Sequence, residues 1–248
     1  MTETDTLDGA TTLVTGATSG IGRATALALA ERGANVALAA RREERLDSIA
    51  KTLRADHGVE TLAVPTDVSD EAQVERMIEQ TTEKFDSLDV LVNNAGLGRE
   101  GSVEELSTED YRQMMDVNVD GMFFATRAAI PHLRESSGNL VFVASFAGQY
   151  PRPANPVYAA TKWWTRGFAH SLEGSVGPDG VAVTVINPTE VRTEFGSEDD
   201  DPLVERFDEG EVTEPREIAE AIVFAANQRR PTTVSEIDLY RRDKFSHF

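Results

Sequence analysis

The chain has 248 residues, of which 40% are hydrophobic, and its 43 acidic against 24 basic residues give a formal net charge of -19. The absence of cysteine excludes a disulfide scaffold, a thiolate nucleophile, a Cys-ligated zinc site and an iron–sulfur cluster, and the acidic balance disfavours nucleic acid and anionic membranes as partners. No apolar run approaches the ~18 residues of a membrane span, and the first residues carry no signal-peptide pattern, so we expect a soluble cytoplasmic protein.

Apolar runs alternate with amphipathic segments along the chain, which predicts strands and helices in alternation. The expected strands cover residues 10–15, 35–40, 61–64, 88–92, 139–144, 181–186 and 234–239. The expected helices cover residues 21–32, 43–57, 70–85, 107 to about 131, 156–176 and 215–227. Continuously apolar strands between helices are typical of a mostly parallel seven-stranded sheet with helices on both faces. The sequence therefore predicts one α/β domain, a doubly wound Rossmann-type fold over residues 1–248, with a substrate loop at about 190–212 and a C-terminal extension at 236–248.

A glycine-rich turn joins the first expected strand to the first expected helix, over residues 15–22 (TGATSGIG). Gly16 permits a tight turn, Gly20 allows backbone to approach a pyrophosphate, and Gly22 allows close packing of helix and sheet. The helix N-terminus presents unpaired N–H groups to an anion. In this strand–turn–helix setting the pattern predicts a dinucleotide site.

The spacing of this turn resembles the fingerprint of the short-chain dehydrogenase/reductase family, and further motifs follow in that family's order. They are Asp67-Val68, Asn93-Asn94-Ala95-Gly96, Asn118, Ser145 and Tyr158-x-x-x-Lys162. The resemblance covers almost the whole chain. It implies hydride transfer between a nicotinamide cofactor and a carbonyl or secondary alcohol substrate, and a homodimer or homotetramer.

The same resemblance implies the roles of four residues. Tyr158 is the general acid/base, Lys162 also holds the nicotinamide ribose, Ser145 polarises the substrate oxygen, and Asn118 supports a proton path to the lysine. The positions expected at the cofactor are Gly16, Thr18, Ser19, Gly20, Ile21, Gly22, Arg41, Arg42, Asp67, Val68, Asn94, Ala95, Gly96, Tyr158, Lys162, Pro188, Val191 and Thr193. No metal site is expected, because the four histidines are scattered.

The tyrosine–lysine spacing also has a direct physical interpretation. Residues four apart on a helix lie on one face, and a nearby ammonium lowers the pKa of a phenol from about 10. A phenol with a lowered pKa is a suitable general acid/base near neutral pH. Lysine is scarce in this chain (only Lys51, Lys84, Lys162 and Lys244), so a lysine at this position indicates a role that arginine does not fill.

The end of the second expected strand indicates which nicotinamide cofactor binds. An acidic residue there would accept hydrogen bonds from the 2′-OH of NAD, but Ala40 and then Arg41 occupy this place. The arginine fork suits a 2′-phosphate, and the hydroxyls of Thr18 and Ser19 can donate to it. The sequence predicts NADP, with NAD as the alternative; Arg42 is either a phosphate ligand or a solvated charge.

The substrate end of the site is less defined by sequence. Phe146, Tyr150 and Phe195 predict partly apolar walls, and Arg152 is either a ligand for a substrate carboxylate or a solvated charge. Thr189 follows Pro188 where the family usually has glycine, so the backbone there either keeps φ negative or departs locally from the family. The segment 238–243 resembles 3-hydroxy acid and serine dehydrogenases. An NAD-preferring sugar or steroid dehydrogenase and a non-catalytic cofactor-binding sensor are the alternative functions.

The composition also bears on the protein's environment. An acidic, lysine-poor surface resembles that of halophilic proteins, since at about 1 M salt a Debye length of roughly 3 Å screens self-repulsion. A merely acidic soluble enzyme is the alternative interpretation.

Overall fold

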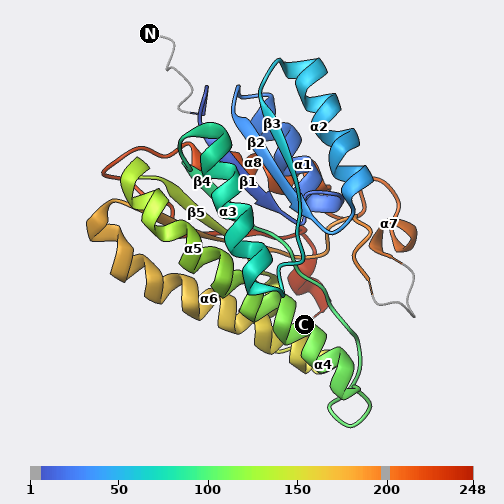
Figure 1. The fold of residues 1–248 in the computed structure, drawn as a ribbon. Helices are drawn as coiled ribbons and strands as arrows, with labels where there is room; N and C mark the ends of the chain where they lie inside the picture. The colour runs from blue at the N-terminus through green and yellow to red at the C-terminus, as the bar shows by residue number, and fades with distance from the viewer. Residues whose placement is uncertain (1–6, 197–201, 248) are drawn as a thin grey trace.

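The computed structural model describes residues 7–196 and 202–247 (Figure 1). Residues 1–6, 197–201 and 248 lie outside the described residues. The expectations for the start of the chain, for part of the acidic loop and for the end of the C-terminal extension fall on them. The described residues contain one seven-stranded sheet in the order β3-β2-β1-β4-β5-β6-β7. Every strand pair is parallel, so the expected α/β Rossmann-type fold is confirmed, with an all-parallel sheet where a mostly parallel one was predicted.

The seven strands match the expected apolar runs closely. They are β1 Thr11–Thr15, β2 Asn35–Ala40, β3 Thr61–Pro65, β4 Val90–Asn93, β5 Asn139–Val143, β6 Ala182–Pro188 and β7 Glu236–Leu239. Side chains alternate across the sheet because of the period of two: Leu13 of β1 packs into the core on one face and Val14 into the core on the other. The strand order reverses between β1 and β4, the switch point where ligands bind in this class of fold.

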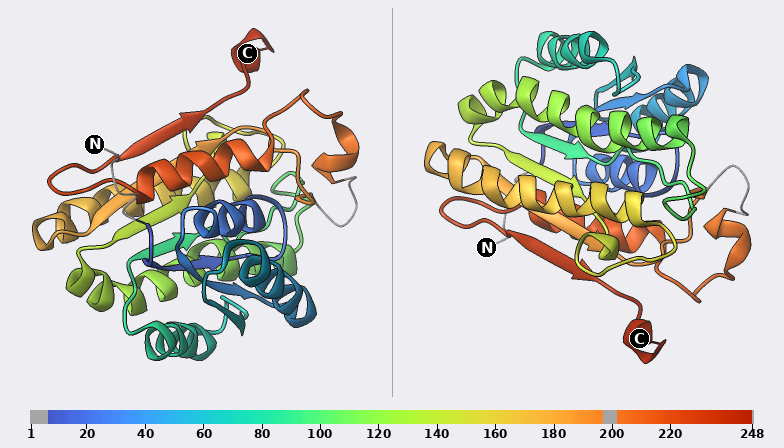
Figure 2. Two further views of the ribbon diagram at one scale, coloured as in Figure 1. Left: turned by 90° about the horizontal axis from the view of Figure 1, so that it is seen from above. Right: turned by 90° about the horizontal axis from the view of Figure 1, so that it is seen from below.

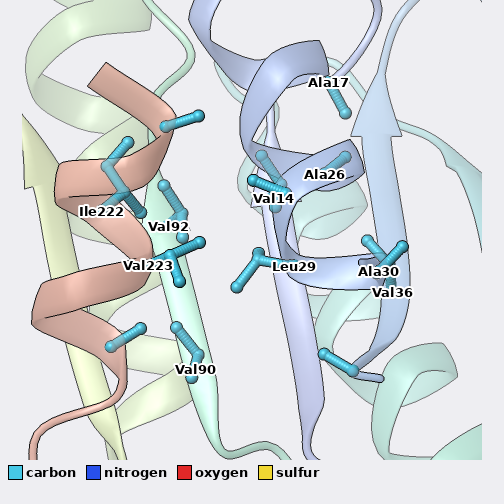
Figure 3. Close-up of a cluster of buried hydrophobic side chains, with 14 of the residues drawn as sticks. Val14, Ala17, Ala26, Leu29, Ala30, Val36, Val90, Val92, Ile222 and Val223 are labelled. Atoms are coloured by element: carbon cyan, nitrogen blue, oxygen red, sulfur yellow. The ribbon is translucent and has the colours of Figure 1, made fainter. Parts of the chain in front are cut away.

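The helices cover both faces of the sheet. They are α1 Gly20–Ala30, α2 Glu43–His57, α3 Glu71–Phe85, α4 Thr108–Met115, α5 Gly121–Ser136, α6 Pro156–Val176, α7 Leu203–Arg206 and α8 Pro215–Ala226. Figure 2 shows α1 and α8 on one face and α3, α5 and α6 on the other. On the first face, Leu29 of α1 and Val223 of α8 pack with Val14 and Val92 (Figure 3). Full burial of each such side chain stabilises the fold by about 1.5–3 kcal/mol.

Two helical segments differ from the expectation. The helix expected from Ser107 to about Pro131 is interrupted by a π-helical turn, Asp116–Asp120, and then continues through Pro131 to Ser136. Leu133 beyond the proline is fully buried, and its packing holds the helix together past the missing N–H. The acidic loop contains the short helix α7, where only loop was predicted. No helix among residues 7–196 and 202–247 is long and apolar enough to cross a membrane.

Candidate active site

A cavity of about 650 Å³ lies at the carboxyl ends of the strands. It is lined by the turn after β1, the ends of β2 to β6, the start of α6 and the segment after β6. The expected site residues line this cavity, apart from Gly22 and Asn118, which lie behind its wall. The motifs that are far apart in the sequence therefore meet in one place.

The glycine positions of the turn have no room for side chains. Gly16 and Gly20 have φ angles of 68° and 50°, in the left-handed region that favours glycine. A Cβ at Gly22 would lie 2.4 Å from the Gly16 carbonyl oxygen, and one at Gly16 would lie 2.8 Å from Asn94 Nδ2. The turn thus brings bare backbone and the N-terminus of α1 to the cavity, an arrangement that fits the pyrophosphate of a dinucleotide.

Thr15, which the sequence analysis did not single out, braces this turn. Its hydroxyl oxygen accepts hydrogen bonds of 3.0 Å from the main-chain N–H groups of Asn94 and Ala95, and its O–H donates to Val92. The Asn94 amide donates in return to the Thr15 carbonyl oxygen over 2.8 Å. These bonds fix the ends of β1 and β4 to each other at the switch point.

Arg42, rather than Arg41, is held against the glycine-rich turn. Its guanidinium donates to the Thr18 hydroxyl over 2.8 Å and to the Ser19 hydroxyl over 3.1 Å, and it pairs with Glu194 at 3.4 Å. Arg41 lines the same part of the cavity and is exposed. Two hydroxyls and the Arg42 guanidinium thus meet where the end of β2 approaches the turn, and Arg41 lines the cavity beside them.

Tyr158 and Lys162 lie on one face of α6, as their spacing predicted. The Lys162 ammonium is 5.8 Å from the centre of the Tyr158 ring and donates to the Val143 carbonyl oxygen over 2.9 Å. Ser145 begins the short 3-10 helix η2 (Phe146–Gly148) and accepts a hydrogen bond of 3.1 Å from Ala147 N–H. The Ser145 side chain is also near enough to the Tyr158 hydroxyl to lower the pKa of that phenol in part. Serine, tyrosine and lysine therefore form one cluster in the cavity wall.

The electrostatics of this cluster differ from the expectation. Burial raises the pKa of Tyr158 to about 12, against the lowering effects of the Ser145 hydroxyl and the Arg152 guanidinium. Burial lowers the pKa of Lys162 to about 8. The expected lowering of the phenol's pKa is therefore not seen, because desolvation of Tyr158 is the largest effect and raises its pKa.

Asn118 is fully buried in the π-helical turn. Its side-chain oxygen accepts from Leu97 N–H over 2.9 Å, and its amide donates to the Leu97 carbonyl oxygen and to the Thr161 hydroxyl. A Cβ at Gly96 would lie 3.3 Å from Asn118 Oδ1 and 3.6 Å from Lys162 Nζ. Asn118 and Lys162 thus flank the small residue Gly96, with the cavity in front.

The segment after β6 shows why threonine is accommodated at position 189. Among residues 7–196 and 202–247 only Asp86 and Ser137 combine a side chain with a positive φ, so Thr189 keeps φ negative. Its N–H donates to the Leu239 carbonyl oxygen, and its hydroxyl accepts from Arg241 N–H, each over 3.1 Å. The threonine therefore ties the C-terminal segment to the edge of the site.

Glu190 and Lys244 form a second link to the C-terminal segment. Lys244 is 8% exposed, pairs with Glu190 and lies 4.7 Å from the centre of the Phe146 ring. Burial raises and the Lys244 ammonium lowers the pKa of the Glu190 carboxyl, and the net shift is downward. Sequence reasoning missed this pair; the retention of a lysine in a lysine-poor chain was the available signal.

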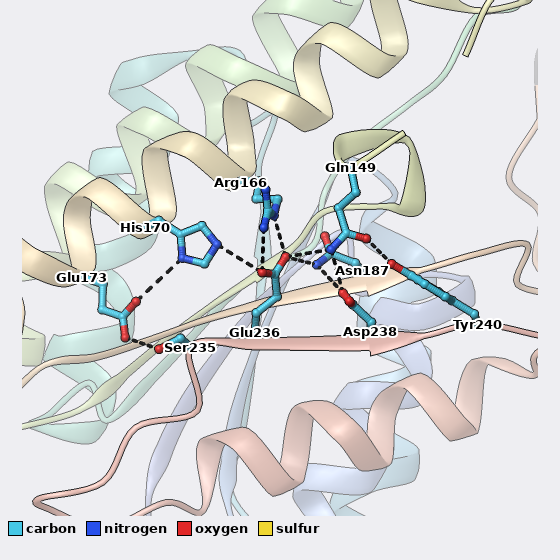
Figure 4. A network of polar contacts seen from close by, with 9 residues as sticks. All are labelled: Gln149, Arg166, His170, Glu173, Asn187, Ser235, Glu236, Asp238 and Tyr240. Carbon is cyan, nitrogen blue, oxygen red and sulfur yellow. Dashed lines mark hydrogen bonds and ion pairs between the residues drawn. The ribbon is translucent and has the colours of Figure 1, made fainter. Parts of the chain in front are cut away.

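A polar network connects α6 to β7 behind the site (Figure 4). Arg166 donates to both carboxylate oxygens of Glu236, over 2.6 and 3.0 Å, and His170 lies 3.4 Å from the same carboxylate. Gln149, which follows η2, donates to Glu236 and to Asp238. The network fixes the segment after Ser145 against the helix that carries Tyr158.

The apolar wall of the cavity differs in one residue from the expectation. Phe195 lies 5.8 Å from Tyr158 between ring centres, and a Cβ at Gly98 would lie 3.0 Å from its ring. Phe146 also lines the cavity. Tyr150 does not belong to the described lining, because it stacks on Phe146 at 4.4 Å from behind.

No group of three or more His, Asp or Glu side chains capable of holding a metal ion occurs in residues 7–196 and 202–247. The donor set of the cavity instead suits a dinucleotide. The bare turn and helix N-terminus suit its pyrophosphate, the groups around Arg42 suit its adenosine ribose, and the cluster around Tyr158 and Lys162 suits its other end.

Comparisons with known proteins agree with this geometry. A family model described as short chain dehydrogenase matches residues 10–203. The chain is 34% identical over 230 residues to an uncharacterized oxidoreductase of Staphylococcus epidermidis, covering 92% of this chain and 95% of that protein. It is also similar to the crystal structure of an alcohol dehydrogenase from Thermococcus sibiricus complexed with 5-hydroxy-NADP (TM-score 0.86, 33% identity, 93% and 95% of the two chains). A 3-ketoacyl-(acyl-carrier-protein) reductase from Brucella melitensis complexed with NADH is similar as well (TM-score 0.83, 30% identity, 95% and 98%).

Proposed function

The chain belongs to the short-chain dehydrogenase family of NAD(P)-dependent oxidoreductases, and on this premise we propose that it interconverts a carbonyl compound and a secondary alcohol with Tyr158 as general acid/base. The observation that supports this proposal most directly is the cluster of Ser145, Tyr158 and Lys162 in one cavity wall, facing the glycine-rich turn. A cofactor-binding sensor without turnover would be expected to lack one of these three groups.

A nicotinamide cofactor held in this cavity would supply the hydride that a carbonyl carbon accepts during reduction. Tyr158 donates its hydroxyl proton to the carbonyl oxygen as that oxygen gains negative charge, and Ser145 donates a hydrogen bond to the same oxygen. Lys162 places a positive charge beside the phenolate that forms, and it would also hold the nicotinamide ribose. Asn118 supports the lysine from behind Gly96. Burial raises the pKa of Tyr158 to about 12, so the phenol carries its proton at neutral pH, and the positive charge of Lys162 is what would favour release of that proton.

We propose NADP as the preferred cofactor. The support is the arrangement of Arg42 with the hydroxyls of Thr18 and Ser19, next to Ala40, which cannot accept a hydrogen bond from a 2′-OH through its side chain. The similar structures carry an NADP derivative in one case and NADH in the other. NAD is therefore the alternative that the assay must compare.

The wider setting is also proposed. The exposed aromatic side chains Phe123 of α5 and Trp163 of α6, 39% and 46% exposed, favour a homodimer or homotetramer formed through these two helices. The net charge of -19 favours a halophilic, cytoplasmic protein, and the segment 238–243 favours a hydroxy acid over a sugar or steroid as substrate.

The decisive experiment measures nicotinamide absorbance with a panel of ketones, aldehydes and 3-oxo acids, with NADPH and NADH in parallel. The proposal expects turnover of at least one carbonyl class, faster with NADPH. Binding of a dinucleotide without turnover of any carbonyl or alcohol would contradict the catalytic proposal and favour the sensor. Equal or greater kcat/KM with NADH would contradict the NADP assignment alone.

A further inference from the structure

The charge around the substrate end of the cavity is opposite to that of the whole chain. The net charge is -19, yet this end is lined by Arg99, Arg152, Arg206 and Lys244 against the acidic Glu100 and Glu190. A cleft of one sign raises the local concentration of ligands of the other sign. Arg152 is near Tyr158 and Lys244 lies over the Phe146 ring, whereas Arg42 is bound to Thr18 and Ser19 in the glycine-rich turn.

Two of these four basic groups are already neutralised by carboxylates. Arg99 lies 3.3 Å from Asp110 and donates to Gln113 over 2.9 Å. Lys244 is paired with Glu190. Arg206 is exposed on the short helix α7. Arg152 remains, half-buried in the cavity wall.

Arg152 is close to the reacting groups and has no counter-charge among the described residues. Its guanidinium makes no side-chain hydrogen bond or ion pair with any residue in 7–196 or 202–247. It is near enough to the Tyr158 hydroxyl for its charge to lower the pKa of that phenol, although burial raises the pKa overall. A half-buried guanidinium gains most from a carboxylate, which can accept two parallel N–H bonds.

The backbone around Arg152 is stiff. Pro151 and Pro153 flank it, and a residue before proline is restricted to extended conformations. The Asn155 N–H donates to the Arg152 carbonyl oxygen over 3.1 Å and closes a turn. This rigidity fixes the backbone that carries Arg152, between η2 and the start of α6, so that no backbone ordering is needed when a ligand binds.

We propose that Arg152 binds a carboxylate of the substrate, so that the enzyme acts on short oxo acids and hydroxy acids in which the carboxylate stands a few bonds from the reacting carbon. This inference rests on the proposed function. It assigns to Arg152 the recognition of the substrate's charge, and it leaves hydride and proton transfer to the groups already described.

The test uses three matched pairs of probes with NADPH: pyruvate, acetoacetate and levulinate, each against its methyl ester. The ester keeps the carbonyl and removes the charge, and chain length reports the distance between the two groups. We expect at least one acid to exceed its ester in kcat/KM by about tenfold or more, since hydrogen bonds to charged groups contribute this much. In the Arg152→Gln variant the ratio of acid to ester falls by a similar factor.

The ratio of kcat/KM for the acid to kcat/KM for its ester separates carboxylate recognition from other effects. Loss of a charge near Tyr158 changes the rate of proton transfer for the acid and the ester alike, so it leaves this ratio unchanged. Arg152→Lys keeps the charge without the fork and is expected to retain part of the preference. Arg76→Gln, which removes an exposed arginine of α3 outside the cavity lining, is the matched control and leaves the ratio unchanged.

Three results would overturn the inference. If the wild-type protein reduces the esters at least as well as all three acids, Arg152 does not recognise a carboxylate, although the proposed oxidoreductase function stands. If Arg152→Gln lowers acid and ester equally, Arg152 has a structural role only. If NADPH binds but no carbonyl compound is reduced, the proposed function fails, and this inference fails with it.

Discussion

The Lys162 ammonium donates a hydrogen bond of 2.9 Å to the main-chain carbonyl oxygen of Val143. Val143 ends β5 two positions before Ser145, so this contact joins the helix that carries the tyrosine to the strand that leads to the serine. Lys162 is only 4% exposed. A neutral carbonyl compensates poorly for the loss of hydration, and burial therefore lowers the pKa of Lys162 to about 8.

The stability of the cofactor-free protein should depend on pH through Lys162. Between pH 8 and the ordinary lysine pKa of 10.5, the unfolded chain holds a proton that the folded protein has released. The free energy of unfolding therefore rises with pH in this window, by about 2 to 3 kcal/mol relative to Lys162→Met. Urea titrations of both proteins near neutral pH and near pH 10 measure this difference, and parallel pH dependences would contradict it.

Replacing Tyr158 by Phe should remove the proton donor and leave the fold intact. We expect kcat/KM to fall at least ~10²-fold, while dinucleotide affinity, followed by fluorescence, stays within a few-fold. Tyr111→Phe on the exposed side of α4 loses a hydroxyl outside the cavity lining and serves as the control. A Tyr158→Phe protein with a near-normal rate would exclude Tyr158 as the acid/base.

Arg42 should determine the choice between the two nicotinamide cofactors more than Arg41 does. Both side chains are exposed, but Arg42 is already positioned by hydrogen bonds to Thr18 and Ser19. Arg42→Gln is expected to lower the NADPH-to-NADH ratio of kcat/KM by about tenfold or more. Arg41→Asp is expected to lower the same ratio because its carboxylate repels the 2′-phosphate. Steady-state kinetics with both cofactors test this, and an unchanged ratio in the Arg42 variant would remove that residue from the phosphate site.

Gly22→Ala should disrupt the glycine-rich turn because the new Cβ would lie 2.4 Å from the Gly16 carbonyl oxygen. We expect a loss of about 1–3 kcal/mol in the free energy of unfolding and weaker dinucleotide binding. Gly174→Ala in α6 meets no atom within 4 Å and should stabilise the protein by about 0.5–1 kcal/mol. Chemical denaturation of the two variants compares them, and equal stabilities would contradict the steric argument.

Glu236 should contribute stability that is lost in acid. The hydrogen bond from Arg166 lowers the pKa of this carboxyl, although burial raises it in part. The stabilisation is therefore complete above the ordinary carboxyl pKa of 4.5 and disappears as the pH falls through the lower folded value. Glu236→Gln is expected to cost about 1–3 kcal/mol at neutral pH and less in acid. Glu79→Gln on the exposed side of α3 is the control. If Glu236→Gln lowers the free energy of unfolding by the same amount at every pH, the ionic role of Glu236 is contradicted.

Sequence alone predicted the fold and most of the cavity lining because both depend on patterns that are local in the chain. Strands buried on both faces appear as short apolar runs, and the residues that follow parallel strands meet at one edge of the sheet. Gly16, Asn94 and Ser145, which are far apart in the chain, could for that reason be placed together before any coordinates were known.

The remaining features depend on contacts between distant segments. Gln149 meets Glu236 and Thr189 meets Arg241, and no periodicity connects these positions. The direction of the Tyr158 pKa shift was missed for the same reason: the spacing to Lys162 predicts proximity, but the extent of burial that dominates the shift depends on the packing of the whole cavity wall.

The π-helical turn at Asp116–Asp120 also constrains how this chain can change its length. Such a turn holds one residue more than the α-helical turn that would replace it. Deleting one residue there would restore regular α-helical geometry, and the helices on either side would keep nearly their present orientation, because the turn absorbs one extra residue. Asn118 lies within this turn, and its hydrogen bonds to Leu97 depend on the widened backbone, so a single-codon deletion would disturb the wall behind Gly96 while leaving α4 and α5 in place.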